Sequence, residues 1–338
     1  MCIFFKSLRR FFNMVKALGL LSGGLDSTLA VKLILDQGID VEALKFTSPF
    51  CQCDKGGKCH AAEAAKKFKI QLKTIDKGKD YLKILRHPKY GYGSGMNPCI
   101  DCRIYTLKKA KKYAKEIGAN FIFTGEVLGQ RPMSQHMKAL NIIEKEAGLE
   151  GKILRPLSAK LLPITEAERN DLVDRSKLLG ISGRGRKEQI ETAKRLKIDY
   201  PCPSGGCLLT DKEFAKKIRD LFKNKKRIAR NDLEHLKIGR HFRFEKSKII
   251  VGRNEKENKR LLELKQKTDY MFEVPNIGSP TTLLQGSKTK EAIEKAAQLT
   301  ARYSDAKEGE TIVKYGNKNL TKSLVVSVNF GEISKLRI

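Results

Sequence analysis

The chain of 338 residues carries 68 lysines and arginines against 38 aspartates and glutamates, a formal net charge of +30 at pH 7. No apolar run approaches the roughly 20 residues that cross a bilayer, which argues against a membrane-spanning protein, and the 40% hydrophobic residues are enough for buried cores. Like charges in this excess repel one another unless they are neutralised. We therefore expect a polyanionic partner, nucleic acid before an anionic membrane surface.

Residues 1–14 are expected to be an N-terminal extension, because a second Met stands at position 14 and no signal-peptide cleavage pattern is present. From residue 15 onward, apolar segments alternate with amphipathic ones. Strands are expected near 16–21, 40–46, 71–76 and 120–125, and helices near 26–38, 60–70 and 102–119. The alternation predicts an α/β domain with a doubly wound parallel sheet over residues 15–165.

The next segment, residues 166–240, is expected to be a helical connector. Helices are predicted near 164–181, 186–198 and 211–236, and a Pro- and Gly-rich break at 200–211 carries Cys202 and Cys207. Residues 241–338 predict a separate, smaller α+β domain.

The stretch SGGLDST, residues 22–28, stands between an expected strand and an expected helix, where phosphate-binding loops occur. Gly23 and Gly24 let backbone N–H groups approach an anion, and the helix N-terminus adds partial positive charge. Ser22 and Ser27 add hydroxyl donors, whereas Asp26 would repel phosphate unless Mg²⁺ bridges the two. There is no Gly-Lys-Ser/Thr, so this is not a Walker A loop. A glycine turn capped by Ser and Asp is the alternative.

The eight cysteines stand mostly in groups. Without a secretory signal we expect a reducing cytoplasm, where grouped cysteines are more often metal-binding or catalytic than disulfide-bonded. The spacing of Cys99 and Cys102 leaves a disulfide, a metal site, a redox couple and a sulfur-transfer site open. The groups are Cys51, Cys53 and Cys59, then Cys99 and Cys102, then Cys202 and Cys207, with Cys2 alone.

SGGLDS after the first strand resembles the PP-loop of ATP pyrophosphatases, enzymes that attach AMP to an oxygen and release pyrophosphate. Within that group, NPCIDC (97–102) and SGGCLLTDKEF (204–214) look like the cysteine segments of tRNA 2-thiouridine and 4-thiouridine synthases. TGEVLGQRP (124–132) is similar to their TGH-type loop, with Glu126 in place of His, and LRPLSAKLLPITEAE (154–168) to the segment that follows. The resemblance covers residues 15–215.

The resemblance implies an ATP-dependent tRNA sulfurtransferase that adenylates a uridine carbonyl oxygen and replaces it with sulfur. Adenylation is needed because that oxygen is a poor leaving group, and Mg²⁺ and basic groups must offset the phosphate charge. The residues expected to bind ATP and its Mg²⁺ are Ser22, Gly23, Gly24, Asp26, Ser27, Thr28, Gly125, Arg131 and Lys160.

The same resemblance implies two sulfur mechanisms. In one, a cysteine carries a persulfide and a second cysteine resolves it. In the other, three cysteines hold a [4Fe–4S] cluster whose fourth iron binds hydrosulfide. Because both Cys99 and Cys102 are present and Cys207 supplies a third thiol, we expect the cluster; Cys202 could substitute for Cys207, and a zinc half-site is the alternative for the pair. The donor would be sulfide or the persulfide of a cysteine desulfurase.

The stretch CQCDKGGKCH, residues 51–60, places three thiols and an imidazole in one Gly-rich segment. Cys51, Cys53, Cys59 and His60 would complete a tetrahedral zinc site. Free thiols near the nucleotide pocket are the alternative.

At the C-terminal end, SKIIVGRNEKEN (247–258) and AAQLTARYSDAK (296–307) look like an NFACT-type RNA-binding domain. The resemblance implies that this domain binds tRNA chiefly through phosphates. Two other functions stay open: an adenylating enzyme that acts on a small molecule, and a non-catalytic RNA-binding factor.

Overall fold

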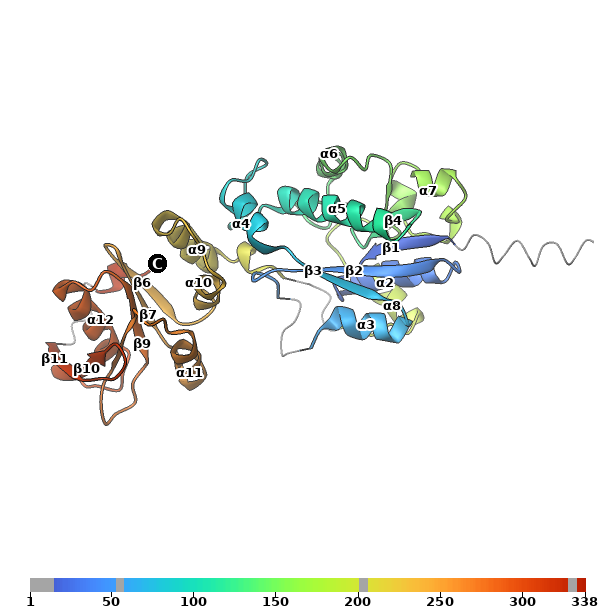
Figure 1. The fold of residues 1–338 in the computed structure, drawn as a ribbon. Helices are drawn as coiled ribbons and strands as arrows, with labels where there is room; N and C mark the ends of the chain where they lie inside the picture. Colours follow the sequence, from blue (N-terminus) through green and yellow to red (C-terminus); the bar gives the residue numbers. More distant parts are fainter. Residues whose placement is uncertain (1–14, 53–57, 201–205, 328–332) are drawn as a thin grey trace, which may run out of the picture. The chain divides into compact units, whose positions relative to one another are not determined.

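The computed structural model describes residues 15–52, 58–200, 206–327 and 333–338 (Figure 1). The chain divides into two compact units, unit 1 (Met1–Thr210) and unit 2 (Asp211–Ile338). The boundary falls inside the connector that was expected over residues 166–240. The expected N-terminal extension, Cys53 and Cys202 lie outside the described residues.

Unit 1 is built on a five-stranded parallel sheet with the strand order β3-β2-β1-β4-β5 (Figure 1). The strands are β1 (Lys16–Leu20), β2 (Asp40–Thr47), β3 (Leu72–Asp76), β4 (Phe121–Thr124) and β5 (Ile153–Leu154). Its longer helices are α2 (Leu25–Leu35), α3 (His60–Phe68), α4 (Gly78–Arg86), α5 (Cys99–Glu116), α6 (Met137–Ala147) and α8 (Lys187–Arg195).

Helices cover both faces of this sheet, so the predicted doubly wound α/β fold is confirmed. Neighbouring residues of β1 point to opposite faces, as side chains in a strand do. Ala17 packs in a core with α2 and α3, whereas Leu18 packs in a second core with α5 and α6. Strand order reverses between β1 and β4, and ligands of such sheets bind at this crevice beyond the carboxyl ends of the strands.

One expected helix, near residues 164–181, was wrong. The structure has only a single turn, α7 (Glu166–Arg169), and a 3₁₀ turn, Arg175–Lys177. Thr165 and Glu168 form a capping box that starts α7. Asp171 then adopts a left-handed φ of 53°, which ends helical geometry.

Unit 2 consists of a six-stranded sheet in the order β11-β10-β8-β9-β7-β6, in which every strand pairing is antiparallel. Helix α12 (Lys290–Arg302) buries its alanines against one face, together with Phe242 and Phe272. The strands are β6 (Arg240–Phe244), β7 (Ser247–Val251), β8 (Tyr270–Glu273), β9 (Thr282–Gly286), β10 (Glu310–Gly316) and β11 (Lys322–Ser327). The other helices are α9 (Lys212–Asn224), α10 (Arg230–His235) and α11 (Glu255–Leu264).

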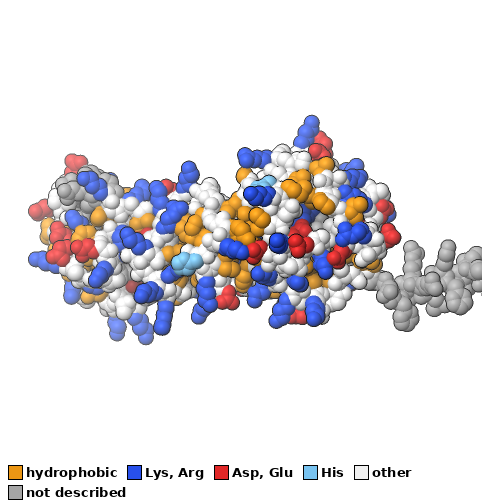
Figure 2. Space-filling model, turned by 90° about the horizontal axis from the view of Figure 1, so that it is seen from above, with side chains coloured by type: hydrophobic (Ala, Val, Ile, Leu, Met, Phe, Trp, Pro, Cys, Tyr) orange, Lys and Arg blue, Asp and Glu red, His pale blue; other side chains and the backbone are white. Residues whose placement is uncertain are grey.

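Within the described part of the chain, no helix has the length and apolarity needed to cross a membrane. Lysine and arginine side chains are spread over the visible face of both units (Figure 2). The charge excess is therefore not confined to a single element.

Candidate active site

The loop between β1 and α2 has the tight geometry that its two glycines permit. Gly23 has a φ of 79°, and a Cβ there would lie 2.4 Å from the backbone N of Ala61, so only glycine fits. At Gly24 a Cβ would meet only Ser22 Oγ, at 3.7 Å, so the backbone is open on that side. The loop thus packs on the start of α3 at one glycine and stays accessible at the other.

Hydroxyl groups tie the loop to the first turn of α2. Ser27 Oγ and Thr28 Oγ1 each donate to the carbonyl oxygen of Gly24, both at 3.0 Å. Ser27 Oγ also accepts from the backbone N–H of Ser22, at 3.2 Å. Gly125, which follows β4, packs against the same turn, because a Cβ there would lie 2.5 Å from Ser27 Cα. The ends of β1 and β4 therefore meet at this loop.

Asp26 projects from the first turn of α2 with a carboxylate oxygen, Oδ1, that is buried and has no hydrogen-bond partner among the described residues. Burial raises the pKa of Asp26, and Arg186, Gln130 and Arg131 oppose that rise without cancelling it. Carboxylate oxygens are preferred ligands of Mg²⁺, which keeps most of its other positions for water and phosphate. The unpartnered oxygen therefore suits a bound magnesium ion.

Glu126 is held between two guanidinium groups directly after Gly125. Its carboxylate is 2% exposed and lies 3.2 Å from Arg103 Nε and 3.1 Å from Arg155 Nε. Burial alone would raise the pKa of Glu126, but the two arginines outweigh it and hold that pKa below its usual value. Because Arg103 directly follows Cys102, this ion pair links the loop after β4 to the cysteine-bearing helix.

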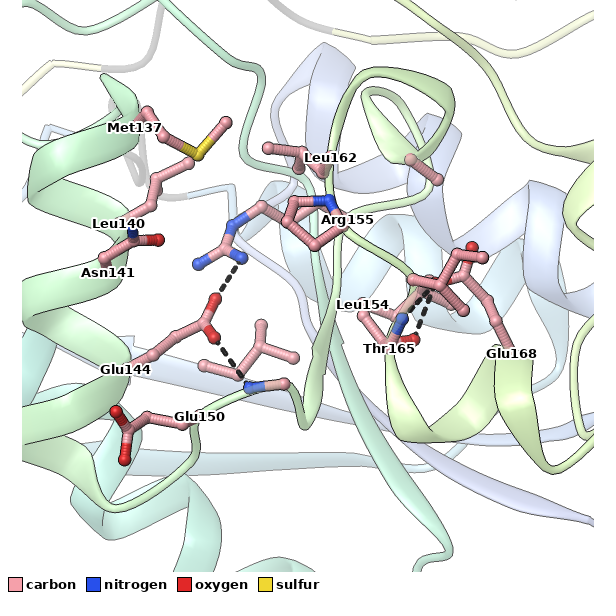
Figure 3. Close-up of a pocket in the computed structure, with 15 residues that line it drawn as sticks. Met137, Leu140, Asn141, Glu144, Glu150, Leu154, Arg155, Leu162, Thr165 and Glu168 are labelled. Atoms are coloured by element: carbon pink, nitrogen blue, oxygen red, sulfur yellow. Dashed lines mark hydrogen bonds and ion pairs between the residues drawn. The ribbon is translucent and has the colours of Figure 1, made fainter.

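Arg155 also lines a pocket of about 300 Å³ beside β5 (Figure 3). Arg155 reaches into it and pairs with Glu144 of α6, which also accepts from the backbone N–H of Gly151. Arg155 thus belongs both to this pocket and to the Glu126 ion pair.

Cys99 and Cys102 lie in the first turn of α5. Because they are three residues apart, they occupy neighbouring positions on one face of the helix. Asn97 Nδ2 donates to Cys99 Sγ at 3.2 Å, and Lys77 Nζ donates to Cys102 Sγ at 2.9 Å. Burial raises the pKa of Cys99. For Cys102 burial acts the same way, but the Lys77 ammonium outweighs it and lowers the pKa.

Asp101, between the two cysteines, has a structural contact of its own. Its carboxylate is 9% exposed and accepts from the backbone N–H groups of Lys89 and Tyr90, at 2.8 and 3.1 Å. These bonds hold the backbone of residues 89 and 90, at the start of the segment that leads to α5.

The segment that carries Cys207 is threaded between two distant parts of unit 1. Leu208 N–H donates to Phe50 O at 2.9 Å, and Met96 N–H donates to Leu209 O at 2.8 Å. This brings Cys207 close to the α5 thiols. Burial, together with the charges of Cys102, Cys51 and Cys99, raises the pKa of Cys207 to about 12.

The cysteine group and the loop are also joined by Arg131. Its charge lowers the pKa of both Asp26 and Cys99, so the guanidinium lies within electrostatic reach of each. Lys160 differs: it lies in the 3₁₀ turn Ala159–Leu161 with an exposed side chain, and none of the described contacts joins it to residues 22–28.

The residues expected to bind zinc have separate partners. Cys51 pairs with Cys207 in an isolated antiparallel bridge, Cys59 Sγ accepts from Lys45 Nζ at 3.0 Å, and His60 Nδ1 lies 3.1 Å from Glu63. No three His, Cys, Asp or Glu side chains of the described ranges are grouped as they would be around a single metal ion. Because Cys53 lies outside those ranges, the four-ligand zinc site stays a prediction.

Sequence reasoning missed several neighbours of the site. Arg186 and Lys77 influence Asp26 or Cys102 but come from segments without a recognisable motif. Gln130, which influences Asp26, lies inside TGEVLGQRP (124–132) but was not singled out there. Arg103 could have been recognised from the sequence as a neighbour of the site, because it follows Cys102 directly at the start of a helix. Arg186 had a weaker signal, since it stands in the basic, glycine-rich stretch GRGRK (183–187).

Comparison with known families gives a match for each unit. Residues 12–177 match the family model described as thiamine biosynthesis protein (ThiI), and residues 239–335 match that of the NFACT protein RNA binding domain. A probable tRNA sulfurtransferase of Methanocaldococcus jannaschii is 28% identical over 214 residues, which are 62% of this chain and 50% of that protein. The chain thus spans half the length of this relative.

Two solved structures are also similar. A 4-thiouridine synthetase–RNA complex with bound ATP shares 26% identity over 54% of this chain and 40% of its own, with a TM-score of 0.39. The U34-tRNA thiolase NcsA from Methanococcus maripaludis, with its [4Fe–4S] cluster, shares 19% identity over 69% of this chain and 77% of its own, with a TM-score of 0.34. At these TM-scores neither likeness assigns a role to any residue here.

Proposed function

We propose that this chain, which joins a ThiI-family domain (residues 12–177) to an NFACT-type RNA-binding domain (residues 239–335), is an ATP-dependent tRNA uridine sulfurtransferase. The observation that carries the proposal is electrostatic: the charges of Cys99 and Cys102 act on Cys207, and Arg131 acts both on Cys99 and on Asp26 of the SGGLDST loop. An enzyme that only adenylates its substrate has no need of such thiols.

In the first half-reaction, the uridine carbonyl oxygen attacks the α-phosphorus of ATP and pyrophosphate leaves. The open backbone at Gly24 and the N-terminus of α2 suit the phosphates. Asp26 would hold Mg²⁺ through its unpartnered oxygen, and Arg131 and Arg186 would offset the remaining negative charge. These residues orient ATP and stabilise the charge that develops on the departing pyrophosphate.

In the second half-reaction, sulfur attacks the activated carbon, and AMP leaves with the former carbonyl oxygen. We propose Cys99, Cys102 and Cys207 as the holders of a [4Fe–4S] cluster, since cysteine thiolates are the ligands of such a group and the charges of Cys99 and Cys102 act on Cys207. Among the described residues the three are not grouped as around a single metal ion, so binding a cluster would have to draw them together. When bound, the cluster supplies an iron with a free position for the sulfur donor, either sulfide or a desulfurase persulfide. Lys77 and Asn97 would hold the thiols of Cys102 and Cys99 in place.

An Asp26→Asn variant tests this assignment, because it keeps the side-chain shape and removes the charge that Mg²⁺ needs. Pyrophosphate release with ATP, Mg²⁺ and unmodified tRNA should fall by at least about 100-fold, with the tRNA dissociation constant unchanged. Mass spectrometry of nucleosides from the treated tRNA should then detect thiouridine with the wild type and none with the variant. Wild-type protein that releases pyrophosphate without tRNA, or leaves tRNA unthiolated when sulfide is supplied, would contradict the proposal.

A further inference from the structure

Cys51 and Cys207 stand directly opposite each other on two antiparallel backbone segments. The bridge is flanked on one side by the hydrogen bond from Leu208 N–H to Phe50 O, at 2.9 Å, and on the other by that from Gln52 N–H to Gly206 O, at 3.3 Å. The two cysteines do not hydrogen-bond each other's backbone, so they form the non-hydrogen-bonded kind of antiparallel pair. Such pairs have Cα atoms about 4.5 Å apart and side chains on the same side.

This geometry matches what a disulfide requires. Disulfide-bonded cysteines have Cα atoms about 4.4–6.8 Å apart, so the pair can close without a backbone shift. Neither cysteine is in a disulfide in the structure, and both are partly exposed. The charge of Cys51 is among the causes that raise the pKa of Cys207, in keeping with this proximity.

The other thiols near Cys207 are less well placed for such a bond. Cys99 and Cys102 belong to one rigid helical turn, and their sulfurs accept hydrogen bonds from Asn97 and Lys77. Cys51 Sγ lies 3.3 Å from the hydroxyl of Ser48, a weak contact that a disulfide would replace.

We infer that Cys51 and Cys207 form a reversible disulfide. With a small-molecule disulfide such as oxidised glutathione as co-reactant, one cysteine thiolate attacks and releases one glutathione thiol. The second cysteine thiolate then attacks the resulting mixed disulfide and releases the other. Two electrons pass from the cysteine pair to glutathione, and the two thiol protons end on the released glutathione.

The disulfide would remove Cys207 from sulfur chemistry, a consequence that rests on the proposed function. A thiol in a disulfide can neither bind iron nor resolve a persulfide. Disulfides in reducing compartments are usually transient and redox-sensing, and this one would make the site inactive under oxidising conditions.

Peptide mapping of the full-length protein tests the disulfide itself. Reduced protein is incubated with oxidised glutathione, free thiols are blocked with iodoacetamide, and tryptic peptides are fragmented. Trypsin leaves Cys51 with Cys53 on one peptide and Cys202 with Cys207 on another, so the fragment ions must locate the bond. We expect a Cys51–Cys207 link. A link from Cys207 to Cys99 or Cys102, or glutathione adducts alone, would overturn the inference.

Neighbouring cysteines provide matched controls. Cys53→Ser and Cys202→Ser should keep the link between the two peptides, whereas Cys51→Ser and Cys207→Ser should lose it while retaining the wild-type circular dichroism spectrum. If Cys53→Ser or Cys202→Ser abolishes the link instead, the pairing is wrong. The wild-type map decides the question even where a variant fails to fold.

Iron uptake tests the consequence separately. After oxidation and removal of glutathione, wild-type protein given ferrous iron without sulfide or oxygen should bind less iron than reduced wild type until a phosphine reductant is added. Oxidised Cys51→Ser should bind as much iron as reduced wild type. Equal iron uptake by oxidised and reduced wild type would refute the claim that the disulfide prevents Cys207 from binding iron. Failure of the reduced protein to bind iron would refute the proposed cluster and leave the disulfide map standing.

Discussion

At the scale of single residues, the structure gives a physical reason why Glu126 departs from the pattern of the resembling family. The sequence identified Glu126 only as an acid where the resembling enzymes have His. In the structure, the carboxylate is buried between Arg103 and Arg155, and it connects the loop after β4 to the first turn of α5. A neutral imidazole could not balance the buried guanidinium group of Arg155 and the half-buried one of Arg103.

Replacing Glu126 with Gln should therefore destabilise unit 1. The change removes the acidic partner of Arg103 and one of the two acidic partners of the buried Arg155, the other being Glu144. Breaking a buried pair costs about 3–5 kcal/mol of unfolding free energy. Because the pKa of Glu126 is lowered, its contribution is present above the ordinary carboxyl pKa and is lost as pH falls through the lowered value. Urea unfolding at neutral pH would measure it.

The matched control is Glu146→Gln, whose carboxylate pairs with Lys89 at the surface. Its effect should be much smaller, since exposed ion pairs contribute little. Equal losses in the two variants would mean that Glu126 does not act as a buried counter-ion.

At the scale of elements, the strand–loop–helix unit at residues 16–35 could be predicted, whereas the position of residues 206–210 could not. The former has a local signature: an apolar run, two glycines and an amphipathic helix. The latter is held by backbone hydrogen bonds to Phe50 and Met96, which leave no pattern in the sequence. Helix α5 also begins at Cys99, three residues before its expected start, so that both thiols share its first turn.

Two glycines of the phosphate loop region should respond differently to Ala. Gly125→Ala would drive a Cβ into the first turn of α2 and lower the unfolding free energy by about 1–3 kcal/mol, as overpacking does. Gly24→Ala has room and an ordinary extended backbone, so stability should hold while ATP binding weakens, because the methyl group stands where phosphate approaches. Thermal unfolding and ATP titration would separate the two. A Gly24→Ala protein that binds ATP normally would argue against the loop as the phosphate site.

At the scale of the whole molecule, each unit has a hydrophobic core of its own, so the proposed nucleotide chemistry and RNA binding can belong to separate units. The net charge of +30 indicated a polyanionic partner from the sequence alone, but not which unit would hold it. The match of residues 239–335 to an RNA-binding domain favours unit 2.

Removing residues 211–338 should therefore weaken tRNA binding far more than ATP binding. Loss of its basic side chains should raise the Kd for tRNA by about tenfold or more and flatten the dependence of binding on salt concentration. The Kd for ATP should stay within about twofold. Filter binding over a series of salt concentrations, beside ATP titration of the same protein, would measure both; equal losses would contradict the division of labour.

The threading of residues 206–210 between the segments at Phe50 and Met96 also bears on how the protein is made. Cys51, Cys99 and Cys102 leave the ribosome long before Cys207, yet the group is complete only when that last segment has inserted. A nascent chain therefore has an unfinished thiol site until nearly all of unit 1 has been synthesised. Loading of a group that Cys99, Cys102 and Cys207 hold together, as proposed, must wait for that moment.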